Sequence, residues 1–367
     1  MGEDSLITAG MLARGLADVH ERLLFHGDLV RQDGRMPPRM RRALARLSAQ
    51  SLRDGADDLG ASIHNVMAMA ARPMCEWGMP SFQGDFPWAN IVLVDGDLGQ
   101  PTAECFELAA GGGSETELLQ EIHHERLRAA AERCGPKMRD RAYREIRGLV
   151  VRRPCLPTAD LFEFIEDWLT AAPDVQSFYR PLPSTALHGK TLRLCAGCGS
   201  PLWPDNDVVS FPNGRCRIRD CRMRHPTCEV AEEFEVTDVG EWRLATNAVL
   251  AYWTGPGLAE IEVHDRLKAA GRTVDLYPYS DAADVSVDGR DVGIDVKSYA
   301  SASLLGARLA RSVGQITMFR RRILCVPDAR VRQDNGYLKT LKAIALQGEG
   351  KCLEFMTVSD VIRELAA

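Results

Sequence analysis

Residues 283–299 read ADVSVDGRDVGIDVKSY, and this stretch decides the fold of the C-terminal third of the chain. Valine and isoleucine alternate with polar residues on both sides of the central DGRD, which is the pattern of two half-buried β-strands. The DGRD tetrapeptide itself has the composition of a tight turn. The stretch therefore predicts a β-hairpin.

The position of the turn determines which carboxylates meet across this hairpin. If Gly289 and Arg290 form a two-residue loop, Asp284 lies opposite Asp295, and paired Cβ atoms are about 4.5–5.5 Å apart. If the loop begins one residue earlier, Asp295 is a diagonal neighbour on the same face, and only an odd-length loop or a bulge would separate the two carboxylates. Opposed like charges are destabilising, so a divalent cation is expected between them, with Lys297 on the same face. The alternative is an exposed face on which Lys297 simply neutralises a carboxylate.

Composition bounds the class of protein. The chain has 367 residues, 45% of them apolar, and a net charge of −6, which suits two or three ordinary domains and excludes a globally basic nucleic-acid binder. Eleven cysteines, an odd number, suit a reducing cytoplasm. No apolar run is long enough for a membrane span, and no export signal is evident, so a cytoplasmic protein without membrane partners is expected.

Three regions are expected along the chain. Residues 1–185 have mainly helical patterns and no recognisable chemistry. Residues 186–233 form a small cysteine-rich module, and residues 234–367 alternate helices and strands, which favours a mixed sheet with helices on its faces. His123 and His124 are adjacent on a predicted helix, so their side chains diverge, and surface positions are expected for them rather than a ligand role.

Four cysteines of the central module have the spacing of zinc ligands. They are Cys195, Cys198, Cys216 and Cys221. The pairs are C-x2-C and C-x4-C, separated by seventeen residues, and Gly199 and Gly214 allow the tight turns of such a site. His225 or Cys228 could replace one ligand, and reduced cysteines without metal are the alternative. Four thiolates leave no open coordination position, so this zinc is expected to be structural.

Clustered arginines are candidate phosphate contacts on an otherwise acidic chain. They lie in residues 31–46, 215–224 and 320–322. Within the cysteine module, Arg217, Arg219 and Arg222 are the expected nucleic-acid-binding residues. The alternative for each group is a solvated surface.

The order of charged residues in the C-terminal region resembles the PD-(D/E)xK nuclease superfamily. A predicted helix carries Glu260, and the hairpin carries Asp284 and then Asp295-Val296-Lys297. The matching run covers about residues 256–325 and implies a restriction-endonuclease-like αβββαβ core with a mixed sheet. The residue before Asp284 is alanine rather than proline, a departure that leaves the chemistry intact.

The resemblance implies roles for these residues. Asp284, Asp295 and the main-chain carbonyl of Val296 would bind Mg²⁺ or Mn²⁺, and Glu260 would support them through water or a second metal ion. Lys297 would orient or deprotonate the attacking water and offset charge on the phosphorane. The products would be a 5′-phosphate and a 3′-hydroxyl. Cleavage of both strands of a duplex would need a homodimer or two encounters.

A narrower resemblance is carried by the helical first half, the cysteine module and residues 248–271, AVLAYWTGPGLAEIEVHDRLKAAG. These are similar to the restriction-endonuclease-like protein of prokaryotic pPIWI-RE systems. That likeness implies defence against phages or plasmids, with a PIWI-related protein and a helicase as partners.

Three classes of function follow from the sequence. The first is a metal-dependent nuclease, with DNA favoured over RNA as its substrate. The second is a catalytically silent nuclease fold that binds nucleic acid or assembles a defence complex. The third is a regulator centred on the zinc module. A nuclease requires a divalent cation to act, whereas the other two do not.

Overall fold

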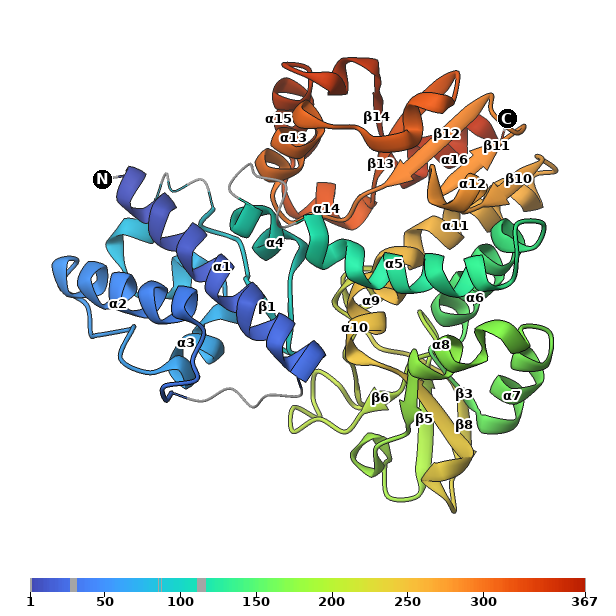
Figure 1. Cartoon of the computed structure of the whole chain (residues 1–367), viewed down its shortest axis with the longest axis horizontal. Helices are drawn as coiled ribbons and strands as arrows, with labels where there is room; N and C mark the ends of the chain where they lie inside the picture. Colours follow the sequence, from blue (N-terminus) through green and yellow to red (C-terminus); the bar gives the residue numbers. More distant parts are fainter. Residues whose placement is uncertain (1, 27–31, 85, 87, 111–116, 367) are drawn as a thin grey trace. The chain divides into compact units, whose positions relative to one another are not determined.

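The computed structural model describes residues 2–26, 32–84, 86, 88–110 and 117–366. The chain divides into two compact units: residues 1–122 with 299–308 form unit 1, and residues 123–298 with 309–367 form unit 2. The elements of each unit are labelled in Figure 1. The three-region division expected from the sequence stays a prediction.

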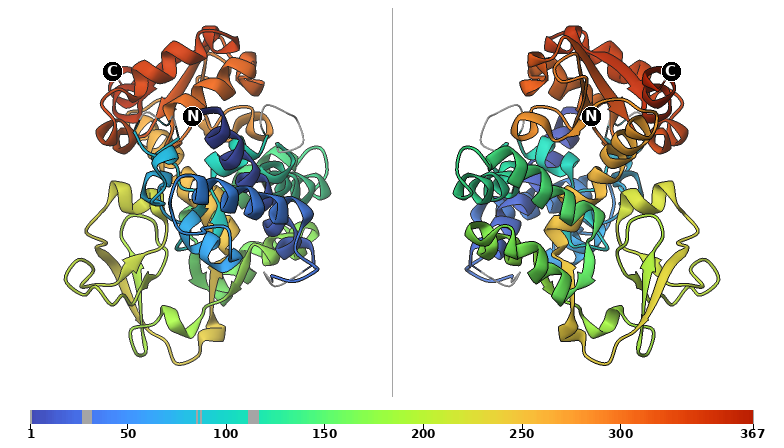
Figure 2. Two further views of the ribbon diagram at one scale, coloured as in Figure 1. Left: turned by 90° about the vertical axis from the view of Figure 1, so that its left-hand side faces the viewer. Right: turned by 90° about the vertical axis from the view of Figure 1, so that its right-hand side faces the viewer.

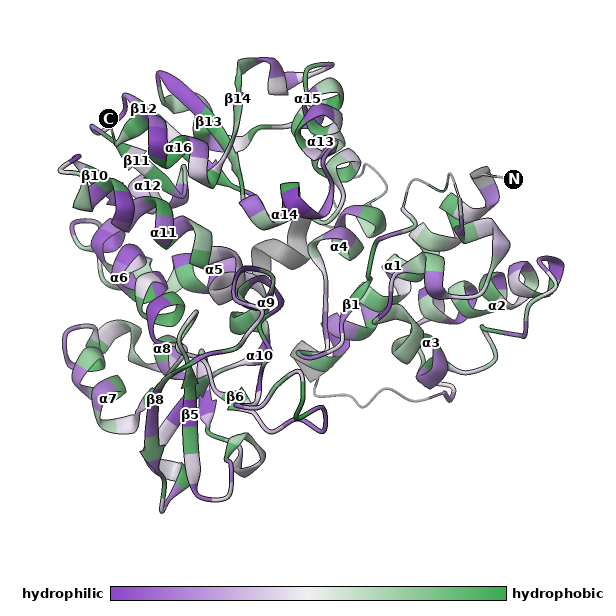
Figure 3. Ribbon diagram, turned by 180° about the vertical axis from the view of Figure 1, so that it is seen from behind, coloured by the Kyte–Doolittle hydropathy of each residue, from purple (hydrophilic) through white to green (hydrophobic). Residues whose placement is uncertain are grey.

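Unit 1 is mainly helical, and its first two helices pack closely. The elements are α1 (Gly2–His26), α2 (Pro38–Arg53), α3 (Ile63–Ala70) and α4 (Ala103–Ala110), with a small hairpin of β1 (Val94–Asp95) and β2 (Gln100–Pro101). A Cβ added at Gly15 would lie 2.8 Å from the Cα of Met40, so this glycine permits the close approach of α1 and α2. The polar and apolar residues along α2 can be followed in Figure 3.

Unit 2 begins with helices and a small three-stranded sheet. The helices are α5 (Glu117–Arg133), which begins before the unit boundary, α6 (Arg139–Arg152), α7 (Thr158–Glu166) and α8 (Ala172–Ser177). The antiparallel sheet has the order β3 (Cys155–Pro157), β9 (Trp242–Ala245) and β4 (Tyr179–Pro181). Within α6, Arg147 lies among buried apolar residues, on the same helical face as Tyr143 and Val150.

The cysteine module consists of two small hairpins and a short helix. The strands are β5 (Thr191–Cys195) with β8 (Val230–Glu235), and β6 (Leu202–Trp203) with β7 (Arg215–Cys216); the helix is α9 (Arg219–Arg224). Gly199 and Gly214 have φ of +71° and +96°, which confirms that their turns require left-handed glycine.

The C-terminal region is built on a five-stranded mixed sheet, so the predicted mixed α/β fold is confirmed. The strand order is β10 (Val274–Leu276), β11 (Val285–Val287), β12 (Val292–Val296), β13 (Arg321–Val326) and β14 (Glu354–Thr357). The first three strands pair antiparallel and the last three parallel. Figure 2 shows this region, in orange and red, from two further sides.

Helices precede, connect and follow these strands along the chain. They are α10 (Asn247–Val249), α11 (Gly255–Ala269), α13 (Ala302–Arg311), α14 (Asp328–Gln333), α15 (Tyr337–Ala345) and α16 (Val358–Leu365), and most of α13 belongs to unit 1. The segment labelled α12 (Pro278–Asp281) has a left-handed rather than a helical backbone at residues 279–280. Val263 of α11 and Val361 of α16 share one apolar cluster with Val285 and Ile294 of the hairpin. Burial of each such side chain stabilises the fold by about 1.5–3 kcal/mol, so this cluster fixes α11 against the hairpin.

The hairpin has the register of the two-residue-loop alternative. Val285 pairs with Ile294 and Val287 with Val292, which places Asp284 opposite Asp295 at the next step of the ladder. The turn between the strands contains two consecutive residues with positive φ, at positions 288 and 289. None of the described helices is long and apolar enough to cross a membrane.

Candidate active site and metal centre

The end of the hairpin brings together the three residues that the sequence singled out there. Asp284 is 5% exposed, and its Oδ2 accepts a hydrogen bond of 2.7 Å from the main-chain N–H of Val296. Lys297 Nζ lies 2.5 Å from Asp295 Oδ1 and 3.8 Å from Asp284 Oδ2. The lysine therefore bridges the two carboxylates.

Glu260 lies in the same region but contacts a different cation. It is 2% exposed on α11, and its two oxygens accept hydrogen bonds of 3.3 and 3.2 Å from Nη2 of Arg147. The same nitrogen lies 3.6 Å from Asp284 Oδ1. Arg147 thus connects Glu260 to the hairpin, although it is 113 residues away from Glu260 in the sequence.

A fourth carboxylate, Asp281, completes the acidic group. Its Oδ2 accepts hydrogen bonds from Arg147 Nη1 at 2.5 Å and from the hydroxyl of Tyr143 at 2.9 Å. His124 Nδ1 lies 3.7 Å from the same oxygen, and the His124 side chain is 27% exposed. His124 is therefore half-buried beside Asp281 rather than fully exposed, and it belongs to no group that could hold a metal ion in the described part of the chain. The side chain of His123 lies outside the described part of the chain.

Sequence reasoning missed Arg147, Asp281 and His124. The signal for Arg147 was an arginine within the apolar face of an amphipathic helix, where a charge is costly unless it is paired. No comparable signal marks Asp281 or His124, because their neighbours come from distant segments.

The four carboxylates outnumber the two cations among them. Burial raises the pKa of Asp284 well above its ordinary value, and the nearby Glu260 charge adds to this, against the attraction of Lys297. Burial likewise raises the pKa of Glu260, with Arg147 opposing it. Burial would also raise the pKa of Asp281, but Arg147 and His124 outweigh it, so its pKa is below the ordinary value. The group is short of positive charge around Asp284.

The oxygen donors of this group suit Mg²⁺ or Mn²⁺, which prefer carboxylates. In the structure, however, these carboxylates contact cationic side chains: Asp284 contacts Arg147 and Lys297, and Asp295 contacts Lys297. Within the described part of the chain, one group of histidine, cysteine or acidic side chains lies close enough together to hold a metal ion. This group is a quartet of cysteines, and it does not include the carboxylates of the hairpin. A divalent ion at the hairpin would have to displace the Lys297 ammonium from Asp295.

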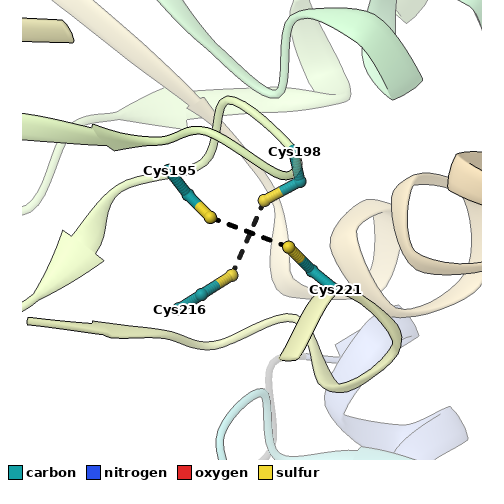
Figure 4. A group of neighbouring side chains, drawn as sticks. All are labelled: Cys195, Cys198, Cys216 and Cys221. Carbon is teal, nitrogen blue, oxygen red and sulfur yellow. Dashed lines mark hydrogen bonds between the residues drawn. The ribbon is translucent and has the colours of Figure 1, made fainter. Parts of the chain in front are cut away.

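The quartet consists of the four cysteines predicted from the sequence (Figure 4). All four are buried, and their Sγ atoms lie within 4.8 Å of one another. Two Sγ···Sγ distances are 3.7 and 3.6 Å, for Cys195–Cys221 and Cys198–Cys216. A tetrahedral zinc with Zn–S bonds of about 2.3 Å requires sulfur separations of about 3.8 Å, so the cluster fits zinc. The alternatives His225 and Cys228 are not part of it.

The cysteine module is also hydrogen-bonded to the segment that follows β12 and carries Lys297. Asp220, next to Cys221 on α9, accepts a hydrogen bond of 2.7 Å from the hydroxyl of Ser298, the residue after Lys297. Arg330 is 5% exposed, donates to the same hydroxyl at 3.2 Å and lies 3.5 Å from Asp220. The quartet therefore helps to hold the end of β12 in place.

The arginines predicted to bind nucleic acid are half-buried, and two have partners within the module. Arg217 stacks on Trp203, with its Cζ 3.5 Å from the ring centroid. Arg222 donates a hydrogen bond to the carbonyl of Cys216. These contacts stabilise the module, and nucleic-acid binding by Arg217, Arg219 and Arg222 stays a prediction.

The C-terminal region has a mixed α/β fold, and its acidic residues follow one another in the order found in restriction-endonuclease-like proteins. This fold and site define the class of protein. Two family models match the chain: residues 257–367 match the model described as "REase associating with pPIWI_RE", and residues 12–157 match "pPIWI_RE three-gene island domain Y". Together, the two matches support a restriction-endonuclease-like protein associated with pPIWI-RE. No curated protein and no solved structure matches it.

Proposed function

We propose that the chain is a divalent-metal-dependent nuclease that hydrolyses phosphodiester bonds of DNA. It would act in prokaryotic defence against phages or plasmids, together with other proteins of a pPIWI-RE island, including a PIWI-related protein and a helicase. The single observation that carries the proposal is the meeting of Asp284, Asp295 and Lys297 at the end of one hairpin. The matched model for residues 257–367 supports it.

The order of elements supports a PD-(D/E)xK core. The helix α11 is followed by β10, the short segment α12, whose backbone is partly left-handed, and then by β11 and β12. Next come α13, most of which belongs to unit 1, and β13. Apart from α12, this is a helix, three strands, a helix and a strand. Asp284 immediately precedes β11, Asp295 lies in β12, and Glu260 lies on the preceding helix α11. These are the positions in which the superfamily carries its acidic residues.

Each residue has a distinct part in the proposed mechanism. Asp284 and Asp295 would hold Mg²⁺ or Mn²⁺, with the carbonyl of Val296 as a further ligand. The ion would activate the attacking water and stabilise charge on the phosphoryl oxygens. Lys297 would leave Asp295 as the ion binds and turn toward the water and the phosphate. The water oxygen would bond to phosphorus as the bond to the 3′-oxygen breaks. The attacking water would release one proton to solvent and the departing 3′-oxygen would take one up from solvent, giving a 5′-phosphate and a 3′-hydroxyl.

One observation favours the second candidate, a catalytically silent fold that binds nucleic acid or assembles a complex. Arg147 and Lys297 already contact the carboxylates that would hold the ion. If these contacts are permanent, the site takes no divalent ion. Such a protein would bind nucleic acid equally well in chelator.

A cleavage assay separates the two candidates. Supercoiled plasmid, linear duplex, single-stranded DNA and RNA would each be incubated with protein in Mg²⁺, in Mn²⁺ and in chelator. The proposal expects cleavage of DNA that needs the divalent ion and is lost in Asp295→Ala. The matched control is Asp291→Ala, which removes a carboxylate of the same hairpin that is 58% exposed and paired with Arg320. Binding without cleavage in every metal condition would favour the silent fold.

A further inference from the structure

Arg147 occupies the centre of the acidic group rather than its edge. Its side chain is 4% exposed and contacts three carboxylates: Glu260, Asp281 and Asp284. Its Cζ also lies 4.0 Å from the centroid of the Tyr277 ring. A guanidinium so deeply buried is stable only because carboxylates surround it, and those carboxylates depend equally on the guanidinium.

The segment that carries Asp281 is held in place by the same helix. Tyr279, Ser280 and Asp281 have φ of +53°, +56° and +78°, a left-handed turn that costs free energy in residues other than glycine. Asp281 bonds to Arg147, and Ser280 Oγ donates to Asp140 Oδ1 at 2.5 Å, so two residues of α6 hold the turn. This left-handed backbone places Asp281 against Arg147.

Without the guanidinium, this corner of the site would be a set of oxygen donors. Glu260, Asp281 and Asp284 would face one another with no cation among them, and such a set is what a divalent ion binds. In the described part of the chain, Asp281 Oδ1 is buried and accepts no hydrogen bond, so it is an available further donor. With Arg147 in place, these three carboxylates are not among the described groups that are close enough to hold an ion. Removal of the guanidinium would leave them free to close around a divalent ion.

We infer that Arg147 is a positioning residue that serves as a fixed internal cation of the nuclease site. It replaces a second divalent ion beside Glu260 and leaves a single ion to be held by Asp284 and Asp295. The inference rests on the proposed function and adds that Glu260 is the partner of an arginine rather than a metal ligand. Arg147 lies in the segment matched by the domain Y model, whereas the three carboxylates lie in the segment matched by the nuclease-associated model. The two segments thus contribute to one site.

The test compares Mn²⁺ stoichiometry in three variants of the full chain with zinc in place. Arg147→Met removes the charge with little loss of volume, and Arg147→Lys keeps the charge. Arg144→Met is the matched control, because Arg144 lies on the same helix but pairs at the surface with Asp275, with side chains 39% and 49% exposed. Calorimetry and electron paramagnetic resonance would count Mn²⁺ per chain, and plasmid cleavage would be measured in the same samples.

The inference expects about one Mn²⁺ per chain in wild type, in Arg147→Lys and in Arg144→Met, and about two in Arg147→Met. Arg147→Met should also gain more in melting temperature on addition of Mn²⁺ than the wild type does. If wild type binds one ion and cleaves DNA while Arg147→Met still binds one, the inference fails and the proposed function stands. Two ions in Arg147→Lys would also contradict it, because charge would then not be what excludes the second ion.

Other outcomes are equally decisive. If wild type binds no Mn²⁺ and cleaves nothing, the proposed function fails. If Arg147→Met does not fold in chelator, the inference expects Mn²⁺ to restore its near-ultraviolet circular dichroism, since the ion takes over the place of the guanidinium. Failure of Mn²⁺ to restore that signal would overturn the inference, and Arg147 would then be an ordinary buried ion-pair partner.

Discussion

Replacing Lys297 with alanine removes the cation that bridges the two hairpin carboxylates. Its ammonium lies 3.8 Å from Asp284 Oδ2, and at an effective dielectric constant of about 20 this pair has a gross attraction of about 4 kcal/mol. The lysine side chain is 27% exposed. Solvent and side-chain entropy therefore reduce the net loss of unfolding free energy in chelator to about 1–2 kcal/mol. The melting temperature should fall by about 3–6 °C.

Cleavage should fall much further than stability. Loss of a cation that acts on the attacking water and the phosphorane costs about 3 kcal/mol, which is a reduction of about 100-fold in the single-turnover rate. Mn²⁺ affinity measured by calorimetry should be kept or increased, because Lys297 competes with the ion for Asp295. Lys268→Ala, at an exposed position near the end of α11, is the control. Cleavage by Lys297→Ala at the wild-type rate, or a loss of Mn²⁺ affinity, would refute this reasoning.

Four further predictions concern other parts of the chain. Purified protein should contain about one zinc per chain, and Cys216→Ser should lose it while Cys352→Ser, at an exposed cysteine, keeps it in metal analysis. Ser298→Ala should keep zinc but slow cleavage about tenfold in a cleavage time course. The reason is that it removes hydrogen bonds to charged partners, which are worth about 1–2 kcal/mol. Arg219→Ala should weaken DNA binding and reduce by about one the slope of the logarithm of the binding constant against the logarithm of salt concentration. An unchanged slope would mean that Arg219 is a solvated surface residue without a phosphate contact. Burial lowers the pKa of His20 from 6.5 to about 4. The unfolded chain therefore binds this proton first, and the contribution of His20 to unfolding free energy should fall by up to about 3 kcal/mol between about pH 6.5 and pH 4. Denaturant titration should find a shallower pH dependence in His20→Gln, and an unchanged one would contradict this.

Local patterns predicted the parts of the site that lie close together in the sequence. The alternation around DGRD and the turn chemistry were enough to place Asp284 opposite Asp295, because strand pairing across a short loop has few registers. The cysteine spacing was likewise enough for the quartet, since the two pairs are held by short turns.

The internal cation could not be predicted in the same way. Arg147 reaches Glu260 and Asp281 only because α6 packs beside α11, and no local pattern determines which helices pack together. The left-handed turn at 279–281 contains no glycine, so its sequence gives no sign of the positive φ angles that bring Asp281 inward. Tertiary contacts impose both features.

The most direct test of the nuclease account is the single-turnover cleavage of supercoiled plasmid by wild type and by Asp284→Asn. Asparagine keeps the shape of the side chain and can still accept the Val296 N–H, but it lacks the charge that holds a divalent ion. The control is Asp288→Asn, which changes a turn carboxylate that is 41% exposed and paired with Arg272. The account predicts cleavage by wild type and Asp288→Asn in Mg²⁺ and none in chelator, with a rate at least about 100-fold lower for Asp284→Asn. Equal cleavage by Asp284→Asn, or cleavage that persists in chelator, would contradict it.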